Sequence, residues 1–364
     1  MNIAVGMSGG VDSAVAAMLL KEQGHNVFGT IMTIWDGAVD PESVPKGNAC
    51  YGPDEDEDIR DAQEVCDFLG IPLHVIDCSK QYSEIILKYF RDEYCDGRTP
   101  NPCVMCNQNM KFGILPSLLA DSGVEFDKFA TGHYCQVEYS KERDRYLLKK
   151  GINPKKDQSY FLYRLTQNQL KKACFPLGEM TKEEVRILAE KGGLPVKYKE
   201  ESQDFYSGDY GDLISSEEAP GNIVDLDGNV LGQHKGIWNY TIGQRKGLGI
   251  SHCNPLYVIE INAEKNEVVL GEKDSLKSKG LKANNINIIY DKIPENAEAK
   301  IRSASPTVPC EITEHSDEEF TVNFFDQQLA VTPGQSVVIY DGEYVIGGGV
   351  ISEVIEKEST TNLH

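Results

Sequence analysis

Hydrophobic positions in the first two hundred residues alternate between short apolar runs and stretches with helical spacing. The apolar runs predict strands at 2–7, 25–34, 72–78 and 126–134. The amphipathic stretches predict helices at 12–23, 58–70, 81–94, 111–121, 167–174 and 182–191. Buried strands that alternate with helices indicate a parallel, doubly wound α/β sheet of the Rossmann-like type. Ligands of such sheets bind beyond the carboxyl ends of the strands.

The pattern changes near residue 201, where Gly, Asn and Asp turns begin to separate short strands. Hairpins are predicted at 223–232 and 256–271, and from about residue 284 the chain is nearly all β. This end of the chain predicts a small antiparallel barrel. We therefore expect an α/β domain, a small mixed or β adaptor domain, a β-barrel and a polar tail, at 1–204, 205–278, 279–358 and 359–364.

Composition and charge narrow the class of protein. The 364 residues are 40% hydrophobic and 26% charged, as in ordinary soluble proteins, and no apolar run of about 18 residues predicts a membrane span. The N-terminus lacks a secretory signal, so we expect a cytoplasmic protein. Ten cysteines in such a protein do not predict a disulfide framework.

The net charge of −21 argues against non-specific adhesion to nucleic acid, DNA included. One local exception lies at 141–156, where seven Lys or Arg stand against two acids. This segment is either a solvated hairpin or a strip that contacts phosphates.

The sequence GMSGGVDS at 6–13 lies between the first predicted strand and helix. Glycines allow a tight turn and close approach to an anion, and the helix N-terminus directs N–H groups to the same place. The loop has no lysine, which distinguishes it from the Walker pattern. Asp12 could cap the helix or hold Mg²⁺.

The sequence CVMC at 103–106 follows two prolines and is the second candidate site. Two cysteines at this spacing can be metal ligands, a redox pair, or a nucleophile and its helper. The CxxC alone does not choose among these readings.

The loop SGGVDS resembles the pyrophosphatase (PP) loop of enzymes that cleave ATP between its α- and β-phosphates and adenylate a substrate. Six further stretches occur in order along the chain: TPNPCVMCN with KF, ATGHY, KDQSYFLY, ESQDF, TIGQRKGLGI and TPGQSVVIYDGE. Together they resemble the tRNA-specific 2-thiouridylase (MnmA/TrmU) family over nearly the whole chain.

The resemblance implies an ATP- and Mg²⁺-dependent tRNA sulfurtransferase that adenylates O2 of the wobble uridine and replaces this oxygen by sulfur. It implies ATP contacts at Gly6, Met7, Ser8, Gly9, Gly10, Val11, Asp12, Ser13, Met32 and Gly132. It implies tRNA contacts at Asn101, Pro102, Cys103, Lys156, Asp157, Gln158, Arg302 and Ser303. Cys106 matches the catalytic cysteine, and Cys103 lies beside the target base.

The chain departs from the family pattern in three segments. Cys103 replaces a usual aspartate. Ser303 and Ala304 stand where the family tends to show tyrosine and then arginine. Tyr206 occupies the place of the usual second cysteine, which carries a persulfide. Because tyrosine cannot carry a persulfide, the usual two-cysteine relay cannot run here.

Two readings of the sulfur chemistry replace that relay. In the first, Cys103 and Cys106 divide the work of persulfide carrier and resolving thiol. In the second, both ligate a [4Fe-4S] cluster together with Cys50 or Cys135. A zinc site is a third reading, although no second CxxC or close histidine pair is present.

Two other functions remain open at this stage. One is an adenylating synthetase of the same loop class that acts on a small molecule, and the other is a tRNA-binding relative impaired in catalysis. For the main reading the partners are tRNA and a sulfur donor, either sulfide or a persulfide carrier protein.

Overall fold

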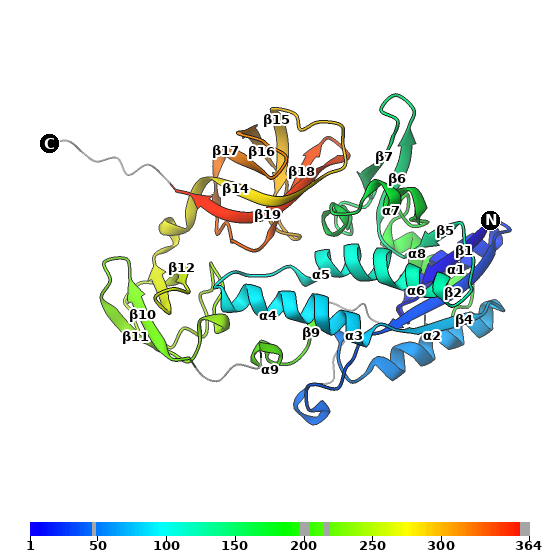
Figure 1. Ribbon diagram of the computed structural model, residues 1–364, viewed down its shortest axis with the longest axis horizontal. Helices are drawn as coiled ribbons and strands as arrows, with labels where there is room; N and C mark the ends of the chain where they lie inside the picture. Colours follow the sequence, from blue (N-terminus) through cyan, green and yellow to red (C-terminus); the bar gives the residue numbers. More distant parts are fainter. Residues whose placement is uncertain (46–48, 197–203, 215–218, 357–364) are drawn as a thin grey trace.

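A parallel five-stranded sheet forms the N-terminal part of the chain (Figure 1). The computed structural model describes residues 1–45, 49–196, 204–214 and 219–356. The sheet has the order β4-β2-β1-β5-β8, with every neighbouring pair parallel. Its strands are β1 (Asn2–Gly6), β2 (Asn26–Thr33), β4 (Leu73–Asp77), β5 (Lys128–Ala130) and β8 (Ala173–Cys174).

Helices cover both faces of this sheet. The helices α1 (Val11–Glu22), α2 (Glu55–Leu69) and α8 (Lys182–Lys191) share a core with Ile3 and Val5. Ala4, between them, points to the opposite core, as strand alternation requires. That core is built by two long helical stretches: α3 (Ser79–Tyr82), the π-helix η2 (Ser83–Leu87) and α4 (Lys88–Cys95), then α5 (Pro102–Met105), the π-helix η3 (Cys106–Ile114) and α6 (Leu115–Asp121).

The middle of the chain forms a second, smaller sheet of order β11-β10-β13-β12 with its own apolar core. It contains the two predicted hairpins, β10–β11 and β12–β13, which are joined by parallel pairing of β10 with β13. The strands are β10 (Gly221–Asp225), β11 (Val230–His234), β12 (Tyr257–Asn262) and β13 (Glu267–Gly271). A separate parallel pair joins β3 (Ala49–Tyr51) to β9 (Asp204–Tyr206), and α9 (Tyr210–Ile214) follows.

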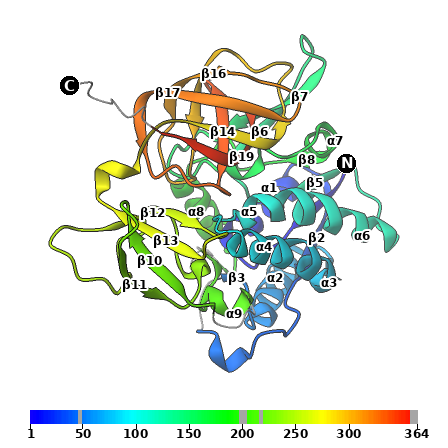
Figure 2. The same cartoon turned by 60° about the vertical axis from the view of Figure 1, so that its left-hand side comes forward.

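The C-terminal strands close into a six-stranded antiparallel barrel, because β14 pairs with both β17 and β19. The strands are β14 (Lys277–Ile288), β15 (Asn296–Lys300), β16 (Val308–Thr313), β17 (Glu319–Leu329), β18 (Ser336–Asp341) and β19 (Tyr344–Ile355). The hairpin of β6 (Cys135–Ser140) and β7 (Arg145–Lys150) extends the barrel sheet at β19. The turned view shows the barrel above α5 (Figure 2).

The predicted fold class is confirmed: a doubly wound parallel sheet, a small β region and an antiparallel barrel. Shorter elements complete the chain: α7 (Gln167–Lys172) and the 3₁₀ helices η1 (Pro41–Ser43), η4 (Ser159–Leu162), η5 (Ile237–Asn239) and η6 (Lys273–Leu276). Residues 201–203 of the ESQDF stretch and the tail from 357 lie outside the described residues. Within the described ranges no helix is long and apolar enough to cross a membrane.

Three boundaries differ from the prediction. The helix expected from residue 111 already begins at Pro102, because Asn101 caps it and proline suits its first position. The first barrel strand begins at Lys277, two residues before the predicted start of the barrel domain at 279. The helix expected at 167–174 ends at Lys172, and the next two residues form the edge strand β8.

Candidate active site

The loop between β1 and α1 presents a helix N-terminus without a side-chain cap. Gly10 is the N-cap residue, and no side chain hydrogen-bonds to the first turn from that position. The Ser13 Oγ accepts from the Ser8 N–H at 3.2 Å and donates to the Gly10 carbonyl at 3.1 Å, which closes the loop. Such a helix end is suited to binding an anion.

Two glycines let neighbouring segments approach this loop. Gly9 has φ +67°, and a Cβ there would lie 2.9 Å from the carbonyl oxygen of Asp58. A Cβ at Gly132 would lie 2.8 Å from the backbone nitrogen of Ser13. Both positions therefore need glycine for the loop to pack against α2 on one side and the segment after β5 on the other.

A pocket of about 240 Å³ opens at this loop. The structure brings nine of the ten predicted ATP contacts to its wall: Gly6, Met7, Ser8, Gly10, Val11, Asp12, Ser13, Met32 and Gly132. Gly9 is buried against Asp58 instead. His133 also lines the pocket and shares a 2.8 Å hydrogen bond with Thr131.

A second pocket, of about 130 Å³, lies beside the first and contains the thiols. Cys50, Cys103 and Cys106 line it, together with Pro102. The two pockets have five lining residues in common: Met7, Ser8, Met32, Cys50 and Lys111. The loop pocket and the thiol pocket are therefore contiguous.

The CxxC cysteines lie at the start of the long helix that crosses beneath the barrel. The Asn101 side chain accepts from the Val104 N–H at 3.4 Å and anchors this helix end. Cys103 is exposed and Cys106 is partly buried at the beginning of the π-helix η3. Residues three apart on a helix lie on the same side, so both thiols reach one pocket.

Lys111 sits next to these thiols. Burial raises the pKa of the Cys106 thiol to about 12, and the positive charge of Lys111 opposes that rise. Burial works to lower the pKa of Lys111, but Cys106, Cys50 and Cys103 together raise it. Among the described residues that line the two pockets, Lys111 is the one Lys or Arg, so it supplies the positive charge of the site.

The structure separates the two candidates for a third cysteine ligand. Cys50 shares the thiol pocket with Cys103 and Cys106. Cys135 is buried in β6 and lines neither pocket. Within the described part of the chain, no three His, Cys, Asp or Glu side chains are arranged to hold a metal ion. The thiols share a pocket without the geometry of an iron–sulfur or zinc site.

Asp12 is engaged by protein groups. Its carboxylate accepts from Lys182 Nζ at 2.7 and 2.9 Å and from the Tyr134 hydroxyl at 2.8 Å. These contacts join α1 to α8 and to the segment after β5. A magnesium ion at Asp12 would compete with Lys182, so Mg²⁺ binding by Asp12 stays a prediction that this arrangement does not favour.

The predicted tRNA-contacting triplet lies at the end of the basic segment. Asp157 accepts from Gly151 N at 3.0 Å and from Ser159 N at 3.1 Å, which shapes the loop after β7. Gln158 lines the ATP-side pocket and accepts from Tyr134 N at 3.0 Å. Lys156 is half-buried beside them. Hence Gln158 is the member of the triplet that reaches the pocket at the phosphate loop.

The second predicted tRNA-contacting pair lies on the barrel after β15. The Arg302 guanidinium donates to the Ala330 carbonyl and to the Thr332 hydroxyl, both at 2.8 Å. Burial lowers the pKa of Arg302. Ser303 beside it is exposed. The geometry makes Arg302 a structural residue of the barrel, and contact of this pair with tRNA remains a prediction.

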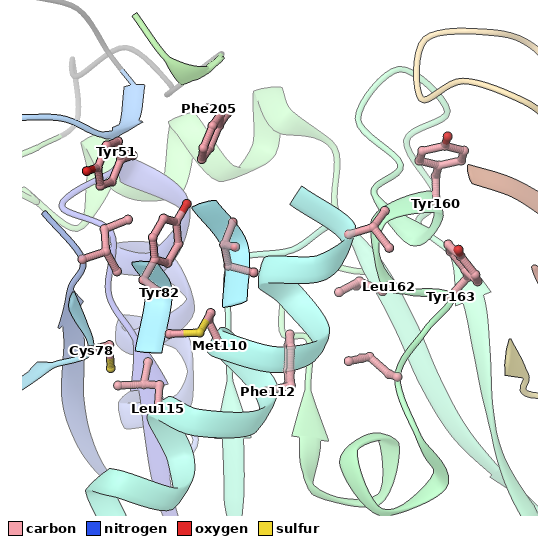
Figure 3. Close-up of a cluster of buried hydrophobic side chains, with 14 of the residues drawn as sticks. Tyr51, Cys78, Tyr82, Met110, Phe112, Leu115, Tyr160, Leu162, Tyr163 and Phe205 are labelled. Carbon is pink, nitrogen blue, oxygen red and sulfur yellow. The ribbon is translucent and has the colours of Figure 1, made fainter. Parts of the chain in front are cut away.

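Tyr206 lies in the aromatic cluster beside the thiol pocket. Its hydroxyl donates to Asp212 at 3.0 Å, and its ring packs 6.2 Å from that of Tyr51. Tyr51, Tyr82 and Phe205 lie together in this cluster (Figure 3). Tyr206 therefore fills space and anchors β9, and the thiols come from other elements.

Three polar residues of the site had no assigned function in the sequence reading. Lys111 belongs to the KF stretch. The signal that could have identified it is its place five positions after Cys106 in the same predicted segment. Glu55 and Asp58 line the thiol pocket and come from the acidic first turn of α2. Glu55 accepts from the backbone of Ile34 and Trp35, and burial raises its pKa.

Fold and site together define a nucleotide-binding α/β protein with a thiol pocket next to its phosphate loop. Three family models match the chain, described as a tRNA methyl transferase HUP domain (residues 1–206), a tRNA methyl transferase PRC-barrel domain (214–272) and an aminomethyltransferase beta-barrel domain (278–351).

Curated relatives match nearly the full length. A tRNA-specific 2-thiouridylase MnmA of Endomicrobium trichonymphae is 49% identical over 96% of this chain and 99% of its own. MnmA 1 of Caldanaerobacter subterraneus is 48% identical over 97% and 98%, and MnmA of Geotalea uraniireducens is 45% identical over 99% and 97%. The chain belongs to the tRNA-specific 2-thiouridylase MnmA family, as its motifs predicted.

Proposed function

We propose that this chain is a cytoplasmic, ATP-dependent tRNA sulfurtransferase. It adenylates the wobble uridine at O2 and replaces this oxygen by sulfur to give 2-thiouridine. ATP, accompanied by Mg²⁺, and tRNA are its substrates, and sulfide or a persulfide carrier protein is the sulfur donor. The relatives' name, tRNA-specific 2-thiouridylase, supports the product.

The single observation that carries this proposal is the contiguity of the two pockets. A uridine carbonyl oxygen is a poor leaving group, and adenylation converts it to AMP, which leaves readily. The phosphate loop binds and orients ATP, and the thiols of the contiguous pocket supply the nucleophile. Lys111 stabilises the negative charge that develops between them.

For sulfur delivery we propose a persulfide on a protein thiol, loaded by a persulfide carrier protein, because sulfide alone cannot form a persulfide without a two-electron oxidant. The thiols of Cys103 and Cys106 share the pocket, but the described residues hold no preformed metal site. A cluster bound by these cysteines is therefore the alternative outcome, to be decided by iron and acid-labile sulfide analysis of anaerobically purified protein.

The test is a reconstituted reaction. Protein is incubated anaerobically with ATP, Mg²⁺, unmodified tRNA, a dithiol reductant and a cysteine desulfurase with cysteine, and sulfide replaces the desulfurase in a second reaction that tests the cluster alternative. We expect 2-thiouridine and pyrophosphate in equal amounts, and loss of 2-thiouridine in C106S. Pyrophosphate release that needs no tRNA would indicate a small-molecule synthetase, and tRNA binding without pyrophosphate release would indicate an impaired relative.

A further inference from the structure

We propose that Cys50 carries the persulfide and that Cys106 is the thiol that resolves it. This inference rests on the proposed function, because it names the sulfur-bearing residue of that reaction. It changes the relay expected from the sequence, in which Cys103 and Cys106 shared both tasks.

The position of Cys50 is set by the small β3–β9 pair. Ala49 pairs with Asp204 and Tyr51 with Tyr206, so the strand is held on both sides of Cys50. The Tyr51 ring is fully buried and stacks 5.7 Å from the ring of Tyr82, and the Tyr51 hydroxyl donates a 2.6 Å hydrogen bond to Asp36. Because side chains alternate along a strand, Cys50 is turned away from this buried ring and is exposed.

Cys50 lies where the ATP-side pocket meets the thiol pocket. Of the cysteines in the ranges that the structure describes, it is the one that lines both the ATP-side pocket and the thiol pocket. Cys103 and Cys106 line the thiol pocket alone. An adenylated carbon must lie where these pockets meet, and a persulfide extends a further ~2 Å from its cysteine sulfur. Cys50 is therefore the thiol best placed to reach that carbon.

Accessibility assigns the two thiols to different tasks. A sulfur donor has to reach the thiol that it loads, and Cys50 is exposed while Cys106 is partly buried. Cys106 lies inside the thiol pocket together with Lys111, whose positive charge stabilises a thiolate there.

Sulfur passes from the donor to the uridine through Cys50, and Cys106 releases it. A persulfide donor transfers one sulfane sulfur to the Cys50 thiolate. The terminal sulfur attacks C2 of the adenylated uridine, the C2–S bond forms, and the C2–O bond breaks with AMP taking the electron pair. The Cys106 thiolate then attacks the Cys50 sulfur, and 2-thiouridine leaves with the electrons of the broken S–S bond. The Cys50–Cys106 disulfide is returned to two thiols by a dithiol reductant.

The experiment compares C50S with C253S in the full-length protein. Cys253 is a matched control because it is also exposed but lines neither pocket. We measure 2-thiouridine and pyrophosphate together and expect the ratio of the two to fall at least a hundredfold in C50S and to stay as in the wild type in C253S. After one turnover without reductant, peptide mass spectrometry of the wild type should find a Cys50–Cys106 disulfide.

Three results would overturn the inference. One is a wild-type product ratio in C50S, and another is a persulfide found on Cys103 with Cys50 unmodified. The third is iron and labile sulfide in the wild type that are lost in C50S, which would make Cys50 a cluster ligand. Failure of the proposed function would be distinct, because the wild type itself would then make no 2-thiouridine with either sulfur source.

Discussion

Single polar residues of the phosphate loop have functions that depend on their partners. Asp12 was expected to cap α1 or to hold Mg²⁺, but Gly10 is the N-cap and the Asp12 carboxylate is paired with Lys182. The side chain of Lys182 is only 7% exposed and that of Asp12 24%, so the ion pair is mostly buried. Removing one partner of a buried ion pair leaves the other charge uncompensated.

We therefore expect D12N to lower the free energy of unfolding by about 3 kcal/mol. The double variant D12N/K182M should regain most of that loss, because no buried charge then remains unpaired. Urea denaturation of the two variants and of K182M alone measures this coupling. A loss in the double variant equal to the sum of the losses in D12N and K182M would show that the pair does not stabilise the fold.

His133 should make stability depend on pH. Burial, aided by the charge of Lys111, lowers its pKa from 6.5 to about 3. Between these values the unfolded chain binds one proton more than the folded chain, so stability falls as the pH is lowered from 6.5 towards 3. The slope is at most about 1.4 kcal/mol per pH unit. Denaturation at several pH values should show a shallower slope in H133N, and an unchanged slope would contradict the low pKa.

At the scale of elements, the site depends on how closely two neighbouring segments approach the N-terminus of α1. Its N-terminal loop is bordered by α2 at Gly9 and by the segment after β5 at Gly132. Both contacts are backbone to backbone, so they leave no room for a side chain. The geometry of the phosphate loop is therefore set by its neighbours as much as by its own glycines.

This predicts a large effect of G132A on nucleotide binding. The new methyl group would lie 2.8 Å from backbone atoms of Asp12 and Ser13, which have no rotamer to change. We expect ATP affinity to fall at least tenfold, measured by calorimetry (~1.4 kcal/mol). Gly52 is the control, because a Cβ there meets nothing within 4 Å. Equal affinity in G132A and G52A would exclude this close approach.

At the scale of the whole molecule, the barrel supports the start of the helix that carries Cys103 and Cys106, here called the thiol helix. The Thr99 N–H donates to the Pro333 carbonyl at 2.9 Å, and Gln335 donates to the Thr99 and Pro100 carbonyls at 3.1 and 2.8 Å. The barrel is also continuous with the β6–β7 hairpin of the first domain. Segments more than two hundred residues apart therefore hold the CxxC in place.

Gly334 tests this support. It has φ +90°, and a Cβ there would lie 2.7 Å from the carbonyl oxygen of Thr99. Gly342 is the matched control, with φ +57° in an open hairpin where nothing lies within 4 Å. We expect G334A to be about 2 kcal/mol less stable than G342A in urea denaturation and to give less 2-thiouridine per pyrophosphate. Equal stability and an equal yield of 2-thiouridine per pyrophosphate in the two variants would show that the contact of the barrel at Gly334 does not support the thiol site.

Much of the fold follows from local pattern. Alternating apolar runs and amphipathic stretches predicted the sheet and most helices, and turn residues such as Asp227 and Gly228 predicted the hairpin of the middle region. The start of the thiol helix was missed although Asn101 and Pro102 are ordinary start signals. The two-residue strand β8 was missed because so short an element has no periodicity.

Residue order within short segments is enough to specify the fold class, the phosphate loop, the CxxC and the family. Which distant residues meet at the site depends on the three-dimensional fold. It brought Cys50 and Lys111 to the CxxC, left Cys135 outside the pocket, paired Asp12 with Lys182 and packed Tyr206 among aromatic rings. The physical reason is that strand pairing and domain packing join segments whose separation along the chain carries no local signal.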